Sequence, residues 1–358
     1  MMEYRTVETL VEELVQAVGD ATGAPARILH LQGTDHPDAM IEFYNEGNPH
    51  KLLIEVKRSL YPRDAREAIW QIRSYLAELG RNEGPIIPVL AAESISPGAR
   101  ELLRAERVGH FDSSGSLFIA AQGLYIRIDR PTSRKHERSI TNIFSGRRAQ
   151  AVHAIWTFGG SWFGVHQVAD RAGVSPATAS ETLISIERRE WVEARGSGPS
   201  KERRLINPRA LLDAWANHQT TTKPAVVKHY YIRSTALSNL QERIDQTCDR
   251  EGIPYEFTGV TAGQIHAPFL STVSQVFCRL PAGQGTKTVL DAIEARPVRE
   301  GWNLAVQETA SEDDLRFRER KSGLWVADPL QTYLDLLQSG GRAKELAQHL
   351  RAEKLDNL

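Results

Sequence analysis

The spacing of hydrophobic residues in the first 130 residues follows one of two patterns, depending on the segment. Apolar residues recur at steps of three and four in some segments, which is typical of amphipathic helices, and form short runs in others, which is typical of strands. The run at 85–94 is apolar almost throughout and predicts a strand buried on both faces. The expected elements are a helix at 6–20, strands at 26–31, 40–44 and 51–57, a helix at 62–79, the strand at 85–94, a helix at 97–107 and two or more closing strands.

Three polar side chains are expected to converge at one end of this sheet. Side chains on a strand alternate between its faces, so Glu55 and Lys57 share a face with Leu53. If the strand at 40–44 pairs with this one through a polar turn, Asp38 comes to the same place. Two carboxylates and an amine would then lie together.

This combination of groups is suited to phosphodiester hydrolysis with a divalent metal. Asp38, Glu55 and the backbone carbonyl of Val56 can supply the hard oxygen ligands that Mg²⁺ or Mn²⁺ prefers. Lys57 can orient a water or neutralise phosphate charge. Glu12 or Glu13 of the first helix could add a further carboxylate or simply face solvent. The alternative for the whole set is a solvated hairpin whose outer face carries Glu and Lys as an ion pair.

The order of these residues resembles the PD-(D/E)xK nuclease family, with Pro37-Asp38 followed by Glu55-Val56-Lys57. The next helix contains Gln71 and Tyr75, similar to the Q-x-x-x-Y motif of the RecB-like branch. Residues four apart share a helix face. The resemblance implies a restriction-endonuclease-like mixed α/β domain at 1–130, with catalytic Asp38, Glu55, Lys57 and Gln71. Tyr75 also fits the apolar stripe of its helix and can be a core residue.

Residues 149–206 carry a second pattern. Three short helical segments lead to two strands around the glycine-rich tip at 196–199, and Ser175-Pro176 is a helix-start signal. The stretch resembles the winged helix-turn-helix superfamily, whose third helix enters the major groove of double-stranded DNA. The alternative is a winged helix used for protein contact. The resemblance implies base contacts by Ser175, Ala177, Thr178 and Ser180, and phosphate contacts by Arg171, Lys201, Arg203 and Arg204.

Charge and composition support this division of the chain. The net charge of the 358 residues is −1, but residues 130–206 contain 13 Lys and Arg against 7 Asp and Glu. The segment 131–148 is polar and basic without periodicity, which predicts a linker.

The only cysteines, Cys248 and Cys278, are expected to pack as small apolar residues rather than bind zinc or form a disulfide. Neither a membrane span nor a signal-peptide pattern is found, so cytoplasm is the expected location.

Residues 207–358 predict an α+β domain with a buried strand at 273–277 and two helices near the end. The sequence from Trp325 to Leu336, with Gly341 to Glu345, resembles the C-terminal part of the AbiEi family. That resemblance implies an antitoxin and autorepressor of a type IV toxin-antitoxin system, whose partner is a nucleotidyltransferase-like toxin. The alternative is a packed helix pair with a buried stripe of Ala343, Leu346, Ala347 and Leu350.

Two functions therefore follow from the sequence. The first is a DNA-binding transcriptional regulator and antitoxin that carries a nuclease-like N-terminal domain. The alternative is a Mg²⁺-dependent DNA endonuclease, for defence or DNA processing, targeted by its winged helix and C-terminal domain. A homodimer is a reasonable expectation for a winged-helix repressor, although no heptad pattern indicates one.

Overall fold

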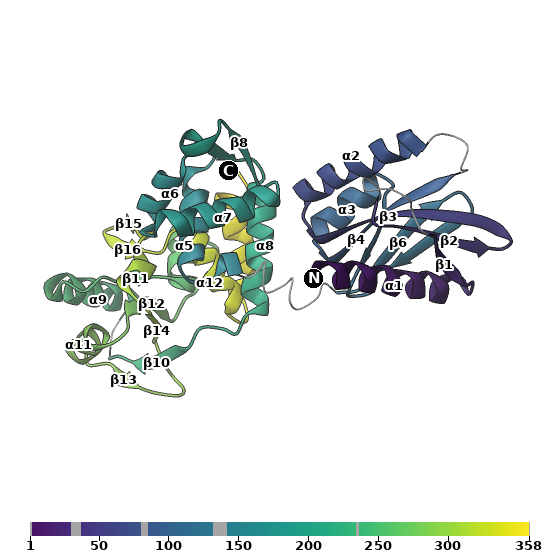
Figure 1. Cartoon of the computed structure of the whole chain (residues 1–358). Coiled ribbons are helices and arrows are strands. Elements are labelled where there is room, and N and C mark those ends of the chain that lie inside the picture. Colours follow the sequence, from purple (N-terminus) through teal and green to yellow (C-terminus); the bar gives the residue numbers. More distant parts are fainter. Residues whose placement is uncertain (1, 30–36, 80–84, 132–141, 234–235, 358) are drawn as a thin grey trace. The chain divides into compact units, whose positions relative to one another are not determined.

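The computed structural model describes residues 2–29, 37–79, 85–131, 142–233 and 236–357. The chain forms two compact units, residues 1–143 with 183–193 and residues 144–182 with 194–358. Helices and a seven-stranded sheet occur in each unit (Figure 1). The protein is therefore of mixed α/β class, as expected.

The sheet of the first unit follows the sequence order from β1 to β7. Strands β3, β4 and β5 are parallel, and the other neighbours are antiparallel. Helices α2 and α3 make the crossovers that parallel neighbours require. The helix predicted at 62–79 is confirmed with the same bounds. The elements are α1 (Met2–Thr22), β1 (Ala26–Leu29), β2 (Ala39–Asn45), β3 (Asn48–Leu60), α2 (Pro62–Leu79), β4 (Ile86–Ile95), α3 (Pro97–Ala105), β5 (Gly109–Asp112), β6 (Leu117–Ala121) and β7 (Leu124–Ile128).

The two faces of this sheet carry separate apolar cores. Helix α1 covers one face, where Leu14 packs in the same cluster as Ile54. Helices α2 and α3 cover the opposite face, where Ile72 and Leu103 cluster with Leu53 (Figure 1). The alternation predicted for β3 is thus confirmed, because consecutive residues of this strand enter different cores.

A two-residue turn sets the register between β2 and β3. Asn45 lies opposite Asn48, and both turn residues between them have positive φ, 50° for Glu46 and 82° for Gly47. Such a turn matches the twist of a hairpin. The register places Ala39 opposite Ile54.

The turn after β5 is built on a buried carboxylate. Asp112 accepts hydrogen bonds at Oδ1 from the backbone N–H of Ser114 (3.0 Å) and of Ser116 (3.4 Å), and its Oδ2 lies 2.6 Å from Nη2 of Arg100. Arg100 and Asp112 are both buried. Asp112 therefore has a turn-forming role.

The second unit begins with short helices and a small sheet. Part of the predicted linker, residues 132–141, lies outside the described residues, but Phe144 is already buried and stacks on Trp215 with ring centroids 5.3 Å apart. Helix α5 starts at Gly146, inside the segment at 131–148 that was predicted to be a linker. The elements are α5 (Gly146–Phe158), α6 (Val165–Ala172), α7 (Pro176–Arg188), which continues into the range grouped with the first unit, and the paired strands β8 (Val192–Arg195) and β9 (Glu202–Leu205).

The large sheet of the second unit has the order β13-β10-β14-β12-β11-β16-β15. The buried strand expected at 273–277 begins at Val276, because only from there does the chain pair with β14. The elements are α8 (Pro208–Thr221), β10 (Val227–Tyr231), α9 (Leu237–Glu251), β11 (Glu256–Phe257), α10 (Gly259–His266), β12 (Val276–Pro281), α11 (Gln284–Ala292), β13 (Arg296–Pro297), β14 (Leu304–Thr309), β15 (Glu319–Lys321), β16 (Leu324–Val326), α12 (Pro329–Gln338) and α13 (Ala343–Lys354).

Helices α9 and α11 pack against the apolar face of this sheet. Cys248 of α9 and Cys278 of β12 belong to that core, so both cysteines pack as small apolar residues. Burial raises the pKa of the Cys248 thiol to about 12. The predicted buried stripe of α13, which begins at Ala343, is also confirmed. Within the described residues, no helix is both long enough and apolar enough to cross a membrane.

Replacing Asp112 by Ala is expected to destabilise the first unit by about 3–5 kcal/mol, because Arg100 would stay buried without its counter-charge. Urea unfolding of the full chain measures the loss, and hydrogen exchange of the α3 and β5 amides locates it. Asp129→Ala is the matched control, since Asp129 pairs with Arg104 at the surface and such pairs contribute little. Equal losses in the two variants would contradict a structural role of Asp112.

Candidate functional site

Asp38, Glu55 and Lys57 lie together in the first unit. The β2–β3 register, extended by one residue, places Asp38 opposite Glu55. Asp38 accepts a hydrogen bond at Oδ2 from the backbone N–H of Val56 at 2.6 Å, and Lys57 Nζ lies 2.6 Å from Glu55 Oε1. Asp38 is exposed and the other two are partly buried. Both carboxylates therefore have a fixed position while remaining accessible.

The donor set fits a hard divalent cation that keeps most of its waters. Each carboxylate uses one oxygen in the contacts above, so Asp38 Oδ1 and Glu55 Oε2 are outside those two contacts. One or two carboxylates are what Mg²⁺ commonly takes from a protein. A larger cage does not form in the described part of the chain, where no three His, Cys, Asp or Glu side chains are grouped for metal binding. Glu12 is exposed on α1, the helix of the opposite sheet face.

Gln71 and Tyr75 lie on the helix that covers the face of Glu55. Tyr75 packs against the core of that face, and partial burial raises the pKa of its phenol. Gln71 is exposed. No described hydrogen bond links Gln71 to Asp38 or Glu55, so the structure brings together three of the four residues expected to be catalytic. The core role considered for Tyr75 agrees with its packing.

The N-terminal turn of α7 is presented to solvent. Ser175 caps the helix, as predicted, by accepting a hydrogen bond from the backbone N–H of Thr178 at 3.2 Å. The hydroxyls of Ser175 and Thr178 also lie 3.0 Å apart. Ala177 is exposed and Ser180 is partly exposed, whereas Ala179 between them is buried. This turn thus offers a methyl group and a hydroxyl on an anchored backbone.

Arg203 departs from the expectation of a phosphate-contacting side chain. Only 5% of its surface is exposed, and its backbone pairs with Phe163 through two hydrogen bonds of 2.8 and 2.9 Å. The neighbouring Lys201 and Arg204 are partly exposed. The physical reason is strand alternation, because Arg203 occupies the inward position between Glu202 and Arg204 on β9.

An arginine that the sequence analysis missed lies next to this strand. The guanidinium of Arg195, at the end of β8, lies 4.2 Å from the ring centroid of Trp162, and that of Arg204 lies 5.0 Å from it. Arg195 also pairs with Glu202 at 2.7 Å. Arg171 is exposed and covers the Phe158 ring at 4.7 Å. The missed signal was an aromatic residue in the glycine-rich loop at 159–164, facing a hairpin with basic ends.

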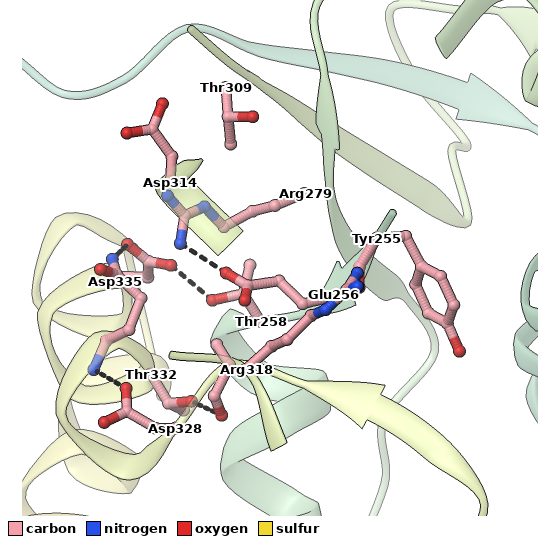
Figure 2. A network of polar contacts seen from close by, with 12 residues as sticks. Tyr255, Glu256, Thr258, Arg279, Thr309, Asp314, Arg318, Asp328, Thr332 and Asp335 are labelled. Atoms are coloured by element: carbon pink, nitrogen blue, oxygen red, sulfur yellow. Dashed lines mark hydrogen bonds and ion pairs between the residues drawn. The ribbon is translucent and has the colours of Figure 1, made fainter. Parts of the chain in front are cut away.

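A third polar cluster lies in the second unit, between the large sheet and α12. Glu256 and Arg279, both buried, form an ion pair of 2.5 Å. Asp335 accepts hydrogen bonds from Thr258 Oγ1 and, at 2.8 Å, from Gln331 Nε2. Figure 2 shows Glu256, Thr258, Arg279 and Asp335 facing one another. Nothing in the local sequence signalled this cluster, because its members lie up to 79 residues apart, from Glu256 to Asp335.

The cluster places more negative than positive charge in a buried region. Burial raises the pKa of Glu256 to about 7; Arg279 opposes the rise, whereas Asp335 and Asp328 add to it. Asp328 is held by His153 of α5, whose Nε2 lies 2.8 Å from Asp328 Oδ2. Protonation of Glu256 near neutral pH therefore relieves repulsion among the carboxylates.

Between pH 5 and pH 7, the free energy of unfolding of the wild type should fall relative to that of Glu256→Gln. Folding raises the pKa of Glu256 from its ordinary 4.5, so the native state binds this proton more tightly, and the stability due to it is lost as the pH rises through about 7. Urea unfolding at several pH values measures the difference. Glu308→Gln, which changes a surface pair with Lys228, is the control. A difference that does not vary with pH would refute the raised pKa.

No protein-family model matches the chain, and no curated protein matches it significantly. The geometry of the three clusters is therefore the basis for a proposal of function.

Proposed function

We propose that the protein is a DNA-binding transcriptional regulator and antitoxin of the AbiEi kind, carrying a nuclease-like N-terminal domain. The observation that carries the proposal is the exposed first turn of α7, in a module that also presents two guanidinium groups around Trp162. Helices α5 to α7 followed by the β8–β9 pair have the element order of a winged helix-turn-helix. In that fold the third helix reads base edges and the wing contacts the backbone.

The geometry refines which residues would contact DNA. Ala177 offers a methyl group for thymine, and Ser180 a hydroxyl for a base edge. The hydroxyls of Ser175 and Thr178 bond to each other, so these residues would mainly fix the helix start. Phosphate contact would come from Arg171, Lys201, Arg195 and Arg204, with Arg203 supporting the wing from inside.

The antitoxin part of the proposal is supported by the resemblance at residues 325–345. This stretch supplies β16, α12 and the start of α13, and Asp328 caps α12 by accepting a hydrogen bond from Gln331 N at 3.0 Å. A nucleotidyltransferase-like toxin is the proposed partner. An adjacent reading frame of that kind would strengthen the proposal, and its absence would weaken it.

Arg195→Ala and Arg204→Ala should each weaken binding to double-stranded DNA from upstream of the protein's own gene. The logarithm of the affinity falls linearly with the logarithm of the salt concentration, and each removed phosphate contact should make this slope less steep by about 0.9. Mobility shifts or anisotropy at several salt concentrations measure both effects. Arg250→Ala, at the end of α9, is the control because it removes an exposed cation outside the module. If the salt dependence of binding is unchanged in both Arg195→Ala and Arg204→Ala, the module formed by α5 to α7 with β8 and β9 is not the part of the protein that contacts DNA.

The site at Asp38 and Glu55 favours a second function, cleavage of DNA. These carboxylates and the Val56 carbonyl would hold Mg²⁺ or Mn²⁺, and such a metal, when bound, acidifies a water and neutralises phosphate charge. The Val56 amide fixes Asp38, and Glu55 holds the Lys57 ammonium within reach of the same place. That ammonium can orient a water or stabilise negative charge on the phosphate. Gln71 would contribute only if its exposed side chain turned toward the site.

Metal-dependent cutting of supercoiled or single-stranded DNA should fall about 100-fold or more in Asp38→Ala and in Lys57→Ala. Agarose gels with Mg²⁺ or Mn²⁺ provide the assay. Glu12→Ala should retain activity, since Glu12 is an exposed carboxylate on the helix of the opposite face. If wild type and all variants give the same trace, the enzyme proposal fails and the regulator proposal stands alone.

A further inference from the structure

A cleft of about 500 Å³ opens in the second unit, on the face of the large sheet opposite to α9 and α11. Val227 and His229 of β10 and Phe277 of β12 line it, together with Trp302 and the loop between α12 and α13. Its size is in the range of sites for cofactors and other small molecules. Neither the regulator nor the nuclease proposal uses it.

Aromatic rings form one wall of this cleft. His229 and Trp302 are stacked, with centroids 4.4 Å apart and planes 11° from parallel, and Phe277 meets Trp302 edge-on at 5.7 Å. The contacts among the rings fix their orientation, so the wall exists before any ligand arrives. Fixed aromatic walls favour flat heterocycles, which stack on them.

A carboxylate lines a small chamber that adjoins the cleft. A side chamber of about 70 Å³ shares Val227, Phe277 and Gln338 with it and ends at Thr258, Gln307 and Asp335. Asp335 accepts hydrogen bonds from Thr258, as Figure 2 shows, and from Gln331. A carboxylate can accept more hydrogen bonds than these two. The chamber is too small for a ring, but it can take an amino group. A carboxylate selects a donor there and disfavours a carbonyl oxygen.

A cation stands near the cleft on the α12–α13 loop. Arg342 lines the cleft, and 61% of its side chain is exposed. Its carboxylate neighbour is Glu345 at 3.7 Å, a loose surface pair that an anion can replace. The cleft thus combines acceptors, a flat aromatic wall and a positive charge.

We propose that this cleft binds a free nucleotide whose base carries an amino group. The base would lie along Trp302 with its amino group toward Asp335, and the phosphate would lie near Arg342. Adenine, guanine and cytosine nucleotides meet this requirement, whereas uracil presents a carbonyl oxygen at the corresponding position. The assignment is independent of the DNA-binding proposal, because it uses none of the same residues.

Calorimetric titration of the full chain with AMP, GMP, CMP and UMP tests the proposal. At least one of AMP, GMP and CMP should bind with an affinity about tenfold higher than that of UMP, or higher still. Adenosine should bind more weakly than AMP. Equal binding of all four nucleotides, or no binding of any at millimolar concentration, would overturn it. Tighter binding of hexadeoxyadenylate than of AMP would overturn the assignment to a free nucleotide.

Three variants separate the parts of the site. Trp302→Ala should lower the affinity for AMP about tenfold. Arg342→Gln should lower the affinity for AMP but not the affinity for adenosine. Asp335→Asn should shift the preference toward UMP, because an amide can donate to the uracil carbonyl; a merely structural role of Asp335 would not reverse selectivity. Trp70→Ala, which removes an exposed indole of the first unit, is the control. Unchanged selectivity in folded Asp335→Asn would refute the orientation proposed for the base.

Discussion

The register of the β2–β3 hairpin determines most of what the first unit can do. Because side chains alternate along a strand, a slip of one residue would exchange the apolar and polar faces of β3. Leu53 would then leave the core under α2, and Glu55 and Lys57 would point into the apolar core under α1. The two-residue turn at Glu46 and Gly47 excludes such a slip. The same constraint that stabilises two cores therefore brings Asp38 to Glu55.

Features that depend on local periodicity could be predicted from the sequence. The bounds of α2, the alternation along β3, the cap at Ser175 and the stripe of α13 follow from spacings within a few residues. The convergence of Asp38 with Glu55 was also accessible, since one tight turn connects the two strands. The families named for these segments stay predictions, because neither the fold geometry nor the comparisons test them.

Features that depend on contacts distant in sequence could not be predicted. The burial of Arg203 follows from its pairing with Phe163, forty residues earlier. The contacts of Arg195 and Arg204 with Trp162 require β8 and β9 to pair in a particular way. The ion pair of Glu256 and Arg279 joins two strands whose surrounding sequence contains no catalytic motif. Charged residues are usually expected at the surface. In each of these cases, the position of a charged residue is determined by a residue that is distant in the sequence.

In the proposed DNA-binding role, Trp162 would affect the kinetics of binding at the β8–β9 pair. Arginine side chains ordinarily lose considerable rotamer freedom when they form a contact, and this loss opposes association. Arg195 and Arg204 already contact the indole in the free protein, so part of the conformational entropy of these side chains is lost during folding and not on binding. In the proposed role, the Trp162 contacts would lengthen the residence time of bound DNA. They would leave the encounter rate unchanged, since the long-range charge is the same with or without the ring.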